Sequence, residues 1–317
     1  MSSVNQRRTL QIFVIVVLFG LTNPASAVDW SSVPGKDIVL FYPAQLSWEM
    51  VLTQDEHSGA KKFREGKDCR QCHEGEERAS GMLLVADAFS DSAPIENKPG
   101  FIEATVKAAH DGENLQINVA FTPGEQPDAE MDKQFPAKVA VMFDDGGVSD
   151  ARRAGCWATC HDNLARMPSG ETAETTKYLA RSRSQMTRRG GTEPKSAEVL
   201  ESLRESGSYL EYWQARLRPD SAPDVIDGFI LEERTQSAAP MVVAEASQEN
   251  GKWSVIFSRP MQPGGLYKDF SPGKTYTVGV SVHAGHTAQR FHYVSLEKTL
   301  VIDEGSADFI AARDDDP

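Results

Sequence analysis

The chain is short of cysteine, of positive charge and of long apolar segments. Its 317 residues include four cysteines, and 46 acidic against 33 basic residues give a net charge of −13. Nucleic acid and anionic membrane surfaces would repel so acidic a protein, so neither is an expected partner. The charge suits docking to a basic patch on another protein, or it serves ordinary solubility. We find no Ser/His/Asp arrangement, phosphate loop or paired-carboxylate pattern that points to catalysis.

The apolar segment at the N-terminus has the organisation of a secretory signal peptide. Arg7 and Arg8 precede an apolar stretch from Thr9 to Leu21, and Ala-Ser-Ala at 25–27 supplies a cleavage site. The stretch is too short for a typical transmembrane helix, and the alternative is an uncleaved anchor. We therefore predict a signal peptide over residues 1–27, a periplasmic protein, and no stable membrane insertion after cleavage.

The first of two cysteine motifs has the spacing of covalent haem attachment. Residues 68–74 contain Cys69, Cys72 and His73 in the order Cys-x-x-Cys-His. In c-type haem attachment, two thiols at this spacing add to the vinyl groups of one porphyrin, and the adjacent His reaches the iron. The alternative is a Cys69–Cys72 disulfide, which would be strained and redox-active. A disulfide leaves His73 unexplained, so we predict a haem c.

The second motif is a near copy that is one residue wider. Cys156, Cys160 and His161 form Cys-x-x-x-Cys-His, so every cysteine of the chain lies in such an element. The wider spacing leaves two possibilities for a second haem, which is either covalently attached or of the b type. A Cys156–Cys160 disulfide is one alternative, and a zinc site built from both motifs is another.

Each iron needs a second axial ligand or keeps an open position. For the first haem the nearby candidates are His57, Met50 and Met82, and we favour His57 because the two Met lie in apolar runs typical of a core. Three further histidines, His283, His286 and His292, cluster between two expected strands and are candidates for the second haem.

Alternating and apolar segments with turn residues between them predict an antiparallel β-sandwich. The expected strands cover residues 101–107, 115–121, 138–143, 228–232, 240–244, 252–258, 275–282 and 292–302. Asn250-Gly251 is a strong hairpin signal between two of them. Between residues 156 and 218 we expect inserted helices, one starting at Ser196 and one over Tyr209–Leu217.

The sequence therefore divides into four parts. Residues 1–27 are the signal peptide, and 28–96 form a small irregular, partly helical haem c module in which 37–43 is a strand or an extended segment. Residues 97–303 form the mainly β, immunoglobulin-like sandwich, which binds the second haem. Residues 304–317 are an acidic tail that we expect to be poorly ordered.

Residues from about 97 to 303 resemble the haem-binding domain of the ethylbenzene dehydrogenase γ-subunit and dimethylsulfide dehydrogenase type. The resemblance rests on the strand 139–143, the motif 155–162 and the closing segment 290–295. It implies a β-sandwich that holds one haem between loops at the sheet end. The γ-subunits of that family use a Met and a Lys as axial ligands. His292 stands where the Lys is expected, and Met142 lies near the Met position.

Together these features resemble a branch of exported cytochromes c with a Cys-x-x-Cys-His module ahead of such a sandwich. We expect a dihaem electron carrier between a membrane multihaem quinol dehydrogenase and a terminal reductase. The expected iron ligands are His73 with His57 and His161 with His292, with His286, His283 and Met142 as weaker candidates. Two alternatives remain, a haem enzyme with one open iron and a relay subunit of a molybdenum-enzyme complex.

Overall fold

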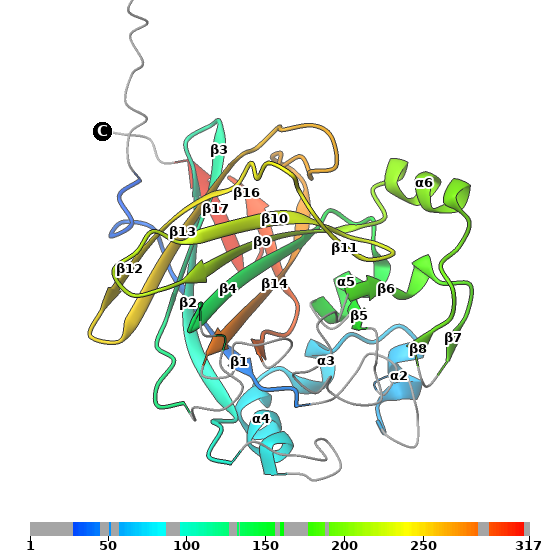
Figure 1. Cartoon of the computed structure of the whole chain (residues 1–317), viewed down its shortest axis with the longest axis horizontal. Helices are drawn as coiled ribbons and strands as arrows, with labels where there is room; N and C mark the ends of the chain where they lie inside the picture. The colour runs from blue at the N-terminus through cyan, green and yellow to red at the C-terminus, as the bar shows by residue number, and fades with distance from the viewer. Residues whose placement is uncertain are drawn as a thin grey trace, which may run out of the picture.

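In a computed structural model, a β-sheet folded on itself carries short helices on one side (Figure 1). The structure describes residues 28–44, 51, 57–86, 96–126, 132, 134–155, 159–161, 177–187, 190–284 and 292–313. The predicted signal peptide lies outside these residues. The helices are α2 (Ala60–Arg64), α3 (Arg70–His73), α4 (Glu77–Ala86), α5 (Ser149–Ala154), the 3-10 turn η2 (Ala180–Ser182) and α6 (Ala197–Glu205).

Thirteen of the described strands are hydrogen-bonded into one sheet. They are β1 (Lys36–Phe41), β2 (Phe101–His110), β3 (Asn114–Phe121), β4 (Ala137–Asp144), β9 (Leu210–Leu217), β10 (Asp224–Ile230), β11 (Arg234–Gln236), β12 (Val243–Glu249), β13 (Lys252–Pro260), β14 (Thr275–Ala284), β15 (Tyr293–Val294), β16 (Lys298–Ile302) and β17 (Phe309–Arg313). Two small ribbons pair β5 (Thr159–His161) with β6 (Lys177–Leu179) and β7 (Met186–Thr187) with β8 (Gly190–Gly191).

The strand order makes two layers joined at one edge. It runs β11-β10-β9-β4-β14-β15-β1-β2-β3-β13-β12, and β16 and β17 make a second link between β14 and β2. All pairs are antiparallel except β16–β17 and β17–β2. The predicted mainly antiparallel sandwich with short helices is confirmed.

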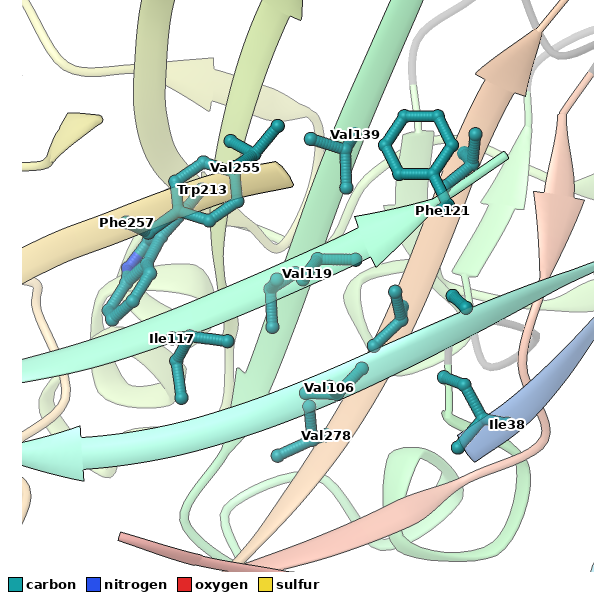
Figure 2. Close-up of a cluster of buried hydrophobic side chains, with 14 of the residues drawn as sticks. Ile38, Val106, Ile117, Val119, Phe121, Val139, Trp213, Val255, Phe257 and Val278 are labelled. Carbon is teal, nitrogen blue, oxygen red and sulfur yellow. The ribbon is translucent and has the colours of Figure 1, made fainter. Parts of the chain in front are cut away.

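The main core lies between the two layers and follows the two-residue period of the strands. Val139 and Val141 of β4 and Val278 of β14 face Val106 and Val119 of the opposite layer. Figure 2 shows Val139, Val278, Val106 and Val119, with Trp213 and Phe257 at one end of the cluster. Burial of this apolar surface is the main force that holds the layers together.

A second core lies on the outer face of the β4–β9–β14 layer. The alternate residues of the same strands, Met142 and Tyr212 among them, point away from the main core and pack with Ala151 of α5 and Phe63 of α2. Figure 1 shows α2, α3 and α5 with β5 and β6 gathered on this side. We call this side of the layer the motif face, because the segments of both cysteine motifs lie there.

The N-terminal segment is part of the sheet and is not a separate lobe. β1 pairs with β2 along its whole length, and Phe41 also pairs with Val294 of β15. Helix α4 crosses β2 at a close backbone contact, because a Cβ on Gly81 would lie 2.0 Å from the Gly100 carbonyl oxygen. Only glycine fits there, so α4 lies directly on the sheet.

Most expected strands are present, and two expectations are wrong. The Asn250-Gly251 hairpin joins β12 to β13 with positive φ at both residues, and Ser196 precedes α6 as expected. Tyr209–Leu217 is not a helix. It contains β9, a central strand with buried side chains on both faces, which removes the alternation that marks a strand. The tail is ordered as far as β17, where Phe309 and Ala311 are buried.

Candidate haem sites

The first motif forms a single helical turn that presents its thiols and its histidine together. Cys69 precedes α3, and its carbonyl oxygen accepts the backbone N–H groups of Cys72 and His73 at 3.2 and 2.9 Å. Both cysteines are free thiols, Cys69 half-buried and Cys72 exposed. The structure therefore has no disulfide between Cys69 and Cys72, which was the alternative to haem attachment.

The ring of His57 lies close to that of His73. The ring centroids are 6.1 Å apart and the planes are tilted by 32°. Two metal–nitrogen bonds of roughly 2 Å, with about 1 Å from each nitrogen to its ring centre, need a centroid separation of about 6 Å. The two imidazoles thus have the spacing of a pair of axial ligands, and the residues present fit a haem c at Cys69 and Cys72.

A hydrogen bond determines which ring nitrogen of His57 is free to bind a metal. Nδ1 lies 2.8 Å from the Val51 carbonyl oxygen, so Nδ1 carries the hydrogen and donates it. Nε2 is left with its lone pair, as a metal ligand requires. Gly59 makes room for the ring, because a Cβ there would lie 2.9 Å from His57 Cε1 and 3.0 Å from Nε2. His73 Nδ1 lies 3.5 Å from Glu76 Oε2.

The alternative Met ligands differ in their placement. Met82 is on α4 and 55% exposed to solvent, and Met50 lies outside the described residues. Within the part of the chain that the structure describes, His57 is therefore the group that opposes His73.

For the second motif the structure describes the backbone of 159–161 as β5, paired with β6. The side chains of Cys156, Cys160 and His161, and the whole of His286, lie outside the described residues. The candidate partners that are described, Met142, His283 and His292, all lie on the motif face and are buried.

His283 and His292 form a stacked pair instead of an opposed one. Their rings are 4.7 Å apart with an interplanar angle of 22°. They are neighbours across β14 and β15, where Val282 pairs with Tyr293, and side chains in such pairs lie about 5 Å apart. That spacing is too small for an iron between the two rings, so at most one of them is an axial ligand while the other supports it.

Met142 lies elsewhere on the same face. It is paired with Gly279, four residues before His283 on β14, and the row between them holds the small residues Ala140 and Ser281. Met142 also borders a narrow gap with Ala151 and Gly155, directly before the second motif. Met142 and His292 therefore lie at different places on the motif face, and both remain candidates.

The two motif segments touch. The Cys69 backbone N–H donates to the Arg153 carbonyl oxygen at 2.9 Å, and Arg153 is three residues before Cys156. Its guanidinium bonds to the carbonyl oxygens of Lys67 and Phe63 and covers the Phe63 ring at 3.8 Å. The described segment that leads into the second motif is therefore in direct contact with the first motif.

Glu297 also contacts the first motif. The sequence gave no indication of this residue. Its Oε1 accepts the backbone N–H of Arg70 at 2.9 Å, while burial raises the pKa of its carboxyl to about 7. Burial, followed by the charge of Glu297, also raises the pKa of the Cys69 thiol. Neither Arg153 nor Glu297 belongs to a recognisable motif, and only the fold brings them to the cysteines.

Two kinds of feature are absent from the described residues, a metal-binding cluster and a membrane-spanning helix. Among the described residues, no group of three or more His, Cys, Asp or Glu side chains could hold a metal ion. None of the described helices has the length and apolarity needed to cross a membrane.

Comparison with known proteins agrees with the motif and the fold. The ethylbenzene dehydrogenase family model matches residues 30–239 and 183–295, beginning well before residue 97, where the sequence suggested the resemblance starts. The chain belongs to this family, which confirms the resemblance.

The relatives that match over nearly full length are cytochromes. Cytochrome c-552 of Stutzerimonas stutzeri is 30% identical over 94% of this chain and 96% of its own length. Cytochrome c-551 of Rhodocyclus tenuis is 26% identical over 90% and 100%. A candidate carbohydrate-binding protein from Bacteroides uniformis is 12% identical, with a TM-score of 0.31, over 65% of this chain and 74% of that chain. That similarity is too low to assign fold or function.

Proposed function

We propose that this protein is an exported dihaem cytochrome c that carries electrons. The observation that supports it best is the opposed pair of His57 and His73 beside two free thiols at the Cys-x-x-Cys-His spacing. With His57 and His73 as its ligands, a haem c held at Cys69 and Cys72 would have no open position for a substrate. The haem supplies the one-electron chemistry, and the chain holds it, orients it and sets its surroundings.

At the second site we propose attachment through Cys156 and Cys160, with His161 and His292 as iron ligands. The position of His292 on the motif face, buried and backed by the His283 ring, supports this choice. The apolar N-terminal segment supports a signal peptide, and we propose that the mature protein is periplasmic. Its partners are a membrane quinol dehydrogenase with several haems and a terminal reductase, and its acidic charge suits basic docking patches on them.

The full-length match to named cytochromes c favours a carrier over an enzyme. The family match favours a second candidate, a relay subunit of a larger oxidoreductase complex. Gentle purification from the native host separates the two, because the relay subunit elutes with its partners and the carrier elutes alone.

The test of the proposed function is the intact mass of the denatured, exported protein together with its reduced visible spectrum. A two-haem mass increment and a low-spin c-type spectrum are expected. A one-haem increment would limit covalent attachment to Cys69 and Cys72, and a colourless protein would overturn the proposal.

A further inference from the structure

Glu297 is a buried acid at the meeting point of the two motif segments. The residue is 5% exposed and follows β15. Its Oε1 accepts the backbone N–H of Arg70, the residue after Cys69, whereas its Oε2 is buried without a hydrogen-bond partner. A buried carboxylate oxygen without a partner is costly, which points to a role other than stability.

The other side of Glu297 contacts the second motif segment. A Cβ on Gly155, the residue before Cys156, would lie 3.0 Å from the Glu297 Cα and 3.2 Å from its backbone nitrogen. Gly155 also has φ = 55°, a conformation that favours glycine. The chain therefore places the carboxyl of Glu297 against the residue that follows Cys69, and its backbone against the residue that precedes Cys156.

The charged neighbours of Glu297 leave it without a strong counter-charge. Asp68, before α3, disfavours its ionisation, and Arg70 on α3 favours it. The Arg70 guanidinium is already engaged by Asp308 and Glu74, both at 2.6 Å. Burial is the largest influence on the carboxyl and raises its pKa to about 7.

We propose that Glu297 is a positioning and tuning residue shared by both haem sites, whose carboxyl charge sets the reduction potential of each and couples electron uptake to proton uptake. This rests on the proposed dihaem function. A negative charge fixed in a buried setting stabilises the oxidised, more positive iron and lowers the reduction potential. By linkage, reduction of either site raises the proton affinity of Glu297. An electron from the redox partner is then accompanied by up to one proton, taken from solvent by the Glu297 carboxylate.

The experiment compares the wild type with Glu297→Gln, Glu297→Asp and Glu74→Gln. Glu297→Gln removes the charge and keeps the shape, while Glu297→Asp keeps the charge. Glu74→Gln is the matched control, because Glu74 lies beside the same α3 and its side chain is 58% exposed to screening solvent. Both reduction potentials are measured by spectroelectrochemical titration at pH 5.5 and pH 8.5, after intact mass has established the number of haems.

The wild type is expected to have lower potentials at pH 8.5 than at pH 5.5 at both sites. Glu297→Gln should raise both potentials at pH 8.5 and leave them near the wild-type values at pH 5.5, where the wild-type carboxyl is neutral. Glu297→Asp should keep the pH dependence, and Glu74→Gln should leave it unchanged.

Unchanged potentials in Glu297→Gln at pH 8.5 would overturn the inference, and a shift at one site only would overturn the shared role. Wild-type potentials that do not vary with pH would overturn it even if Glu297→Gln fails to accumulate. A protein without haem is the separate failure of the proposed function.

Discussion

The described residues include two pairs of neighbouring histidine rings, and the distance between the rings differs from one pair to the other. His57 and His73 come from different segments and leave 6.1 Å between their centroids. His283 and His292 are cross-strand neighbours and stack at 4.7 Å. The regular geometry of a sheet holds facing side chains about 5 Å apart, so it cannot open a gap for an iron. A pair of axial ligands needs at least one partner from outside the sheet ladder, as His57 and His73 provide.

The largest effect is expected when the opposed pair is broken. His57→Ala removes an axial ligand and should convert the first haem from low spin to high spin, whereas His283→Ala should leave that haem low spin. Visible and electron paramagnetic resonance spectra of both variants measure this. An unchanged spin state in His57→Ala would mean that His57 is not a ligand and that the first iron has another partner or an open position.

A similar effect at the second site tests which member of the stacked pair reaches the iron. His292→Ala should produce a high-spin second haem, and His283→Ala should keep it low spin because only the supporting ring is lost. Met142→Leu is the companion variant, since it conserves volume and removes the thioether. A high-spin second haem in Met142→Leu, with none in His292→Ala, would transfer the ligand role to Met142.

A smaller effect, on the pH dependence of stability, is expected from the buried Lys98 beside the stacked pair. Lys98 donates to the Ala284 carbonyl oxygen at 3.2 Å and lies 4.4 Å from the centroid of the Tyr293 ring. Burial lowers its pKa to about 7, so between pH 7 and 10.5 the unfolded chain binds a proton that the folded chain does not. Stability should therefore rise over that range, by about 4 kcal/mol for this group.

Denaturant unfolding at pH 7 and pH 10 measures this rise, with Lys98→Met as the comparison. The variant should lack the part of the rise that Lys98 contributes. If both proteins show the same pH dependence, Lys98 is charged in the folded protein and does not keep the neutral form that burial favours.

The smallest expected effect comes from crowding His57 without removing it. Gly59→Ala would bring a Cβ to 2.9 Å from the ring, so the ring must shift by a few tenths of an ångström. We expect a mixed-spin first haem with the same covalent attachment, measured by spectrum and intact mass. A fully low-spin haem would show that the His57 ring can shift away from the added methyl group and still bind the iron.

The sequence was informative wherever a pattern is local. The Asn250-Gly251 hairpin and most strands follow from neighbouring residues and were predicted correctly. Tyr209–Leu217 was taken for a helix because β9 is buried on both faces and loses its alternation.

The contacts that join the motifs could not be predicted, because they depend on packing. Arg153 carries no motif, yet its carbonyl oxygen meets Cys69 and its guanidinium covers Phe63. Glu297 lies 227 positions from Arg70 in the chain, and nothing in either neighbourhood marks the pair. The spacing of the histidine rings likewise needs coordinates, since the sequence gave His292 as the expected ligand and His283 as a weaker candidate without placing either ring.

The ion pair between Arg70 and Asp308 has a consequence for the order in which the protein matures. Arg70 lies inside the first motif, and its partner is 238 positions later, next to β17. A chain that is synthesised and exported from its N-terminus exposes Cys69 and Cys72 long before Asp308 and Glu297 exist to hold them. For an exported cytochrome c of the kind proposed above, the thiols would be accessible to the attachment machinery while α3 is undocked, and the last strand would close the structure over a motif that has already received its haem.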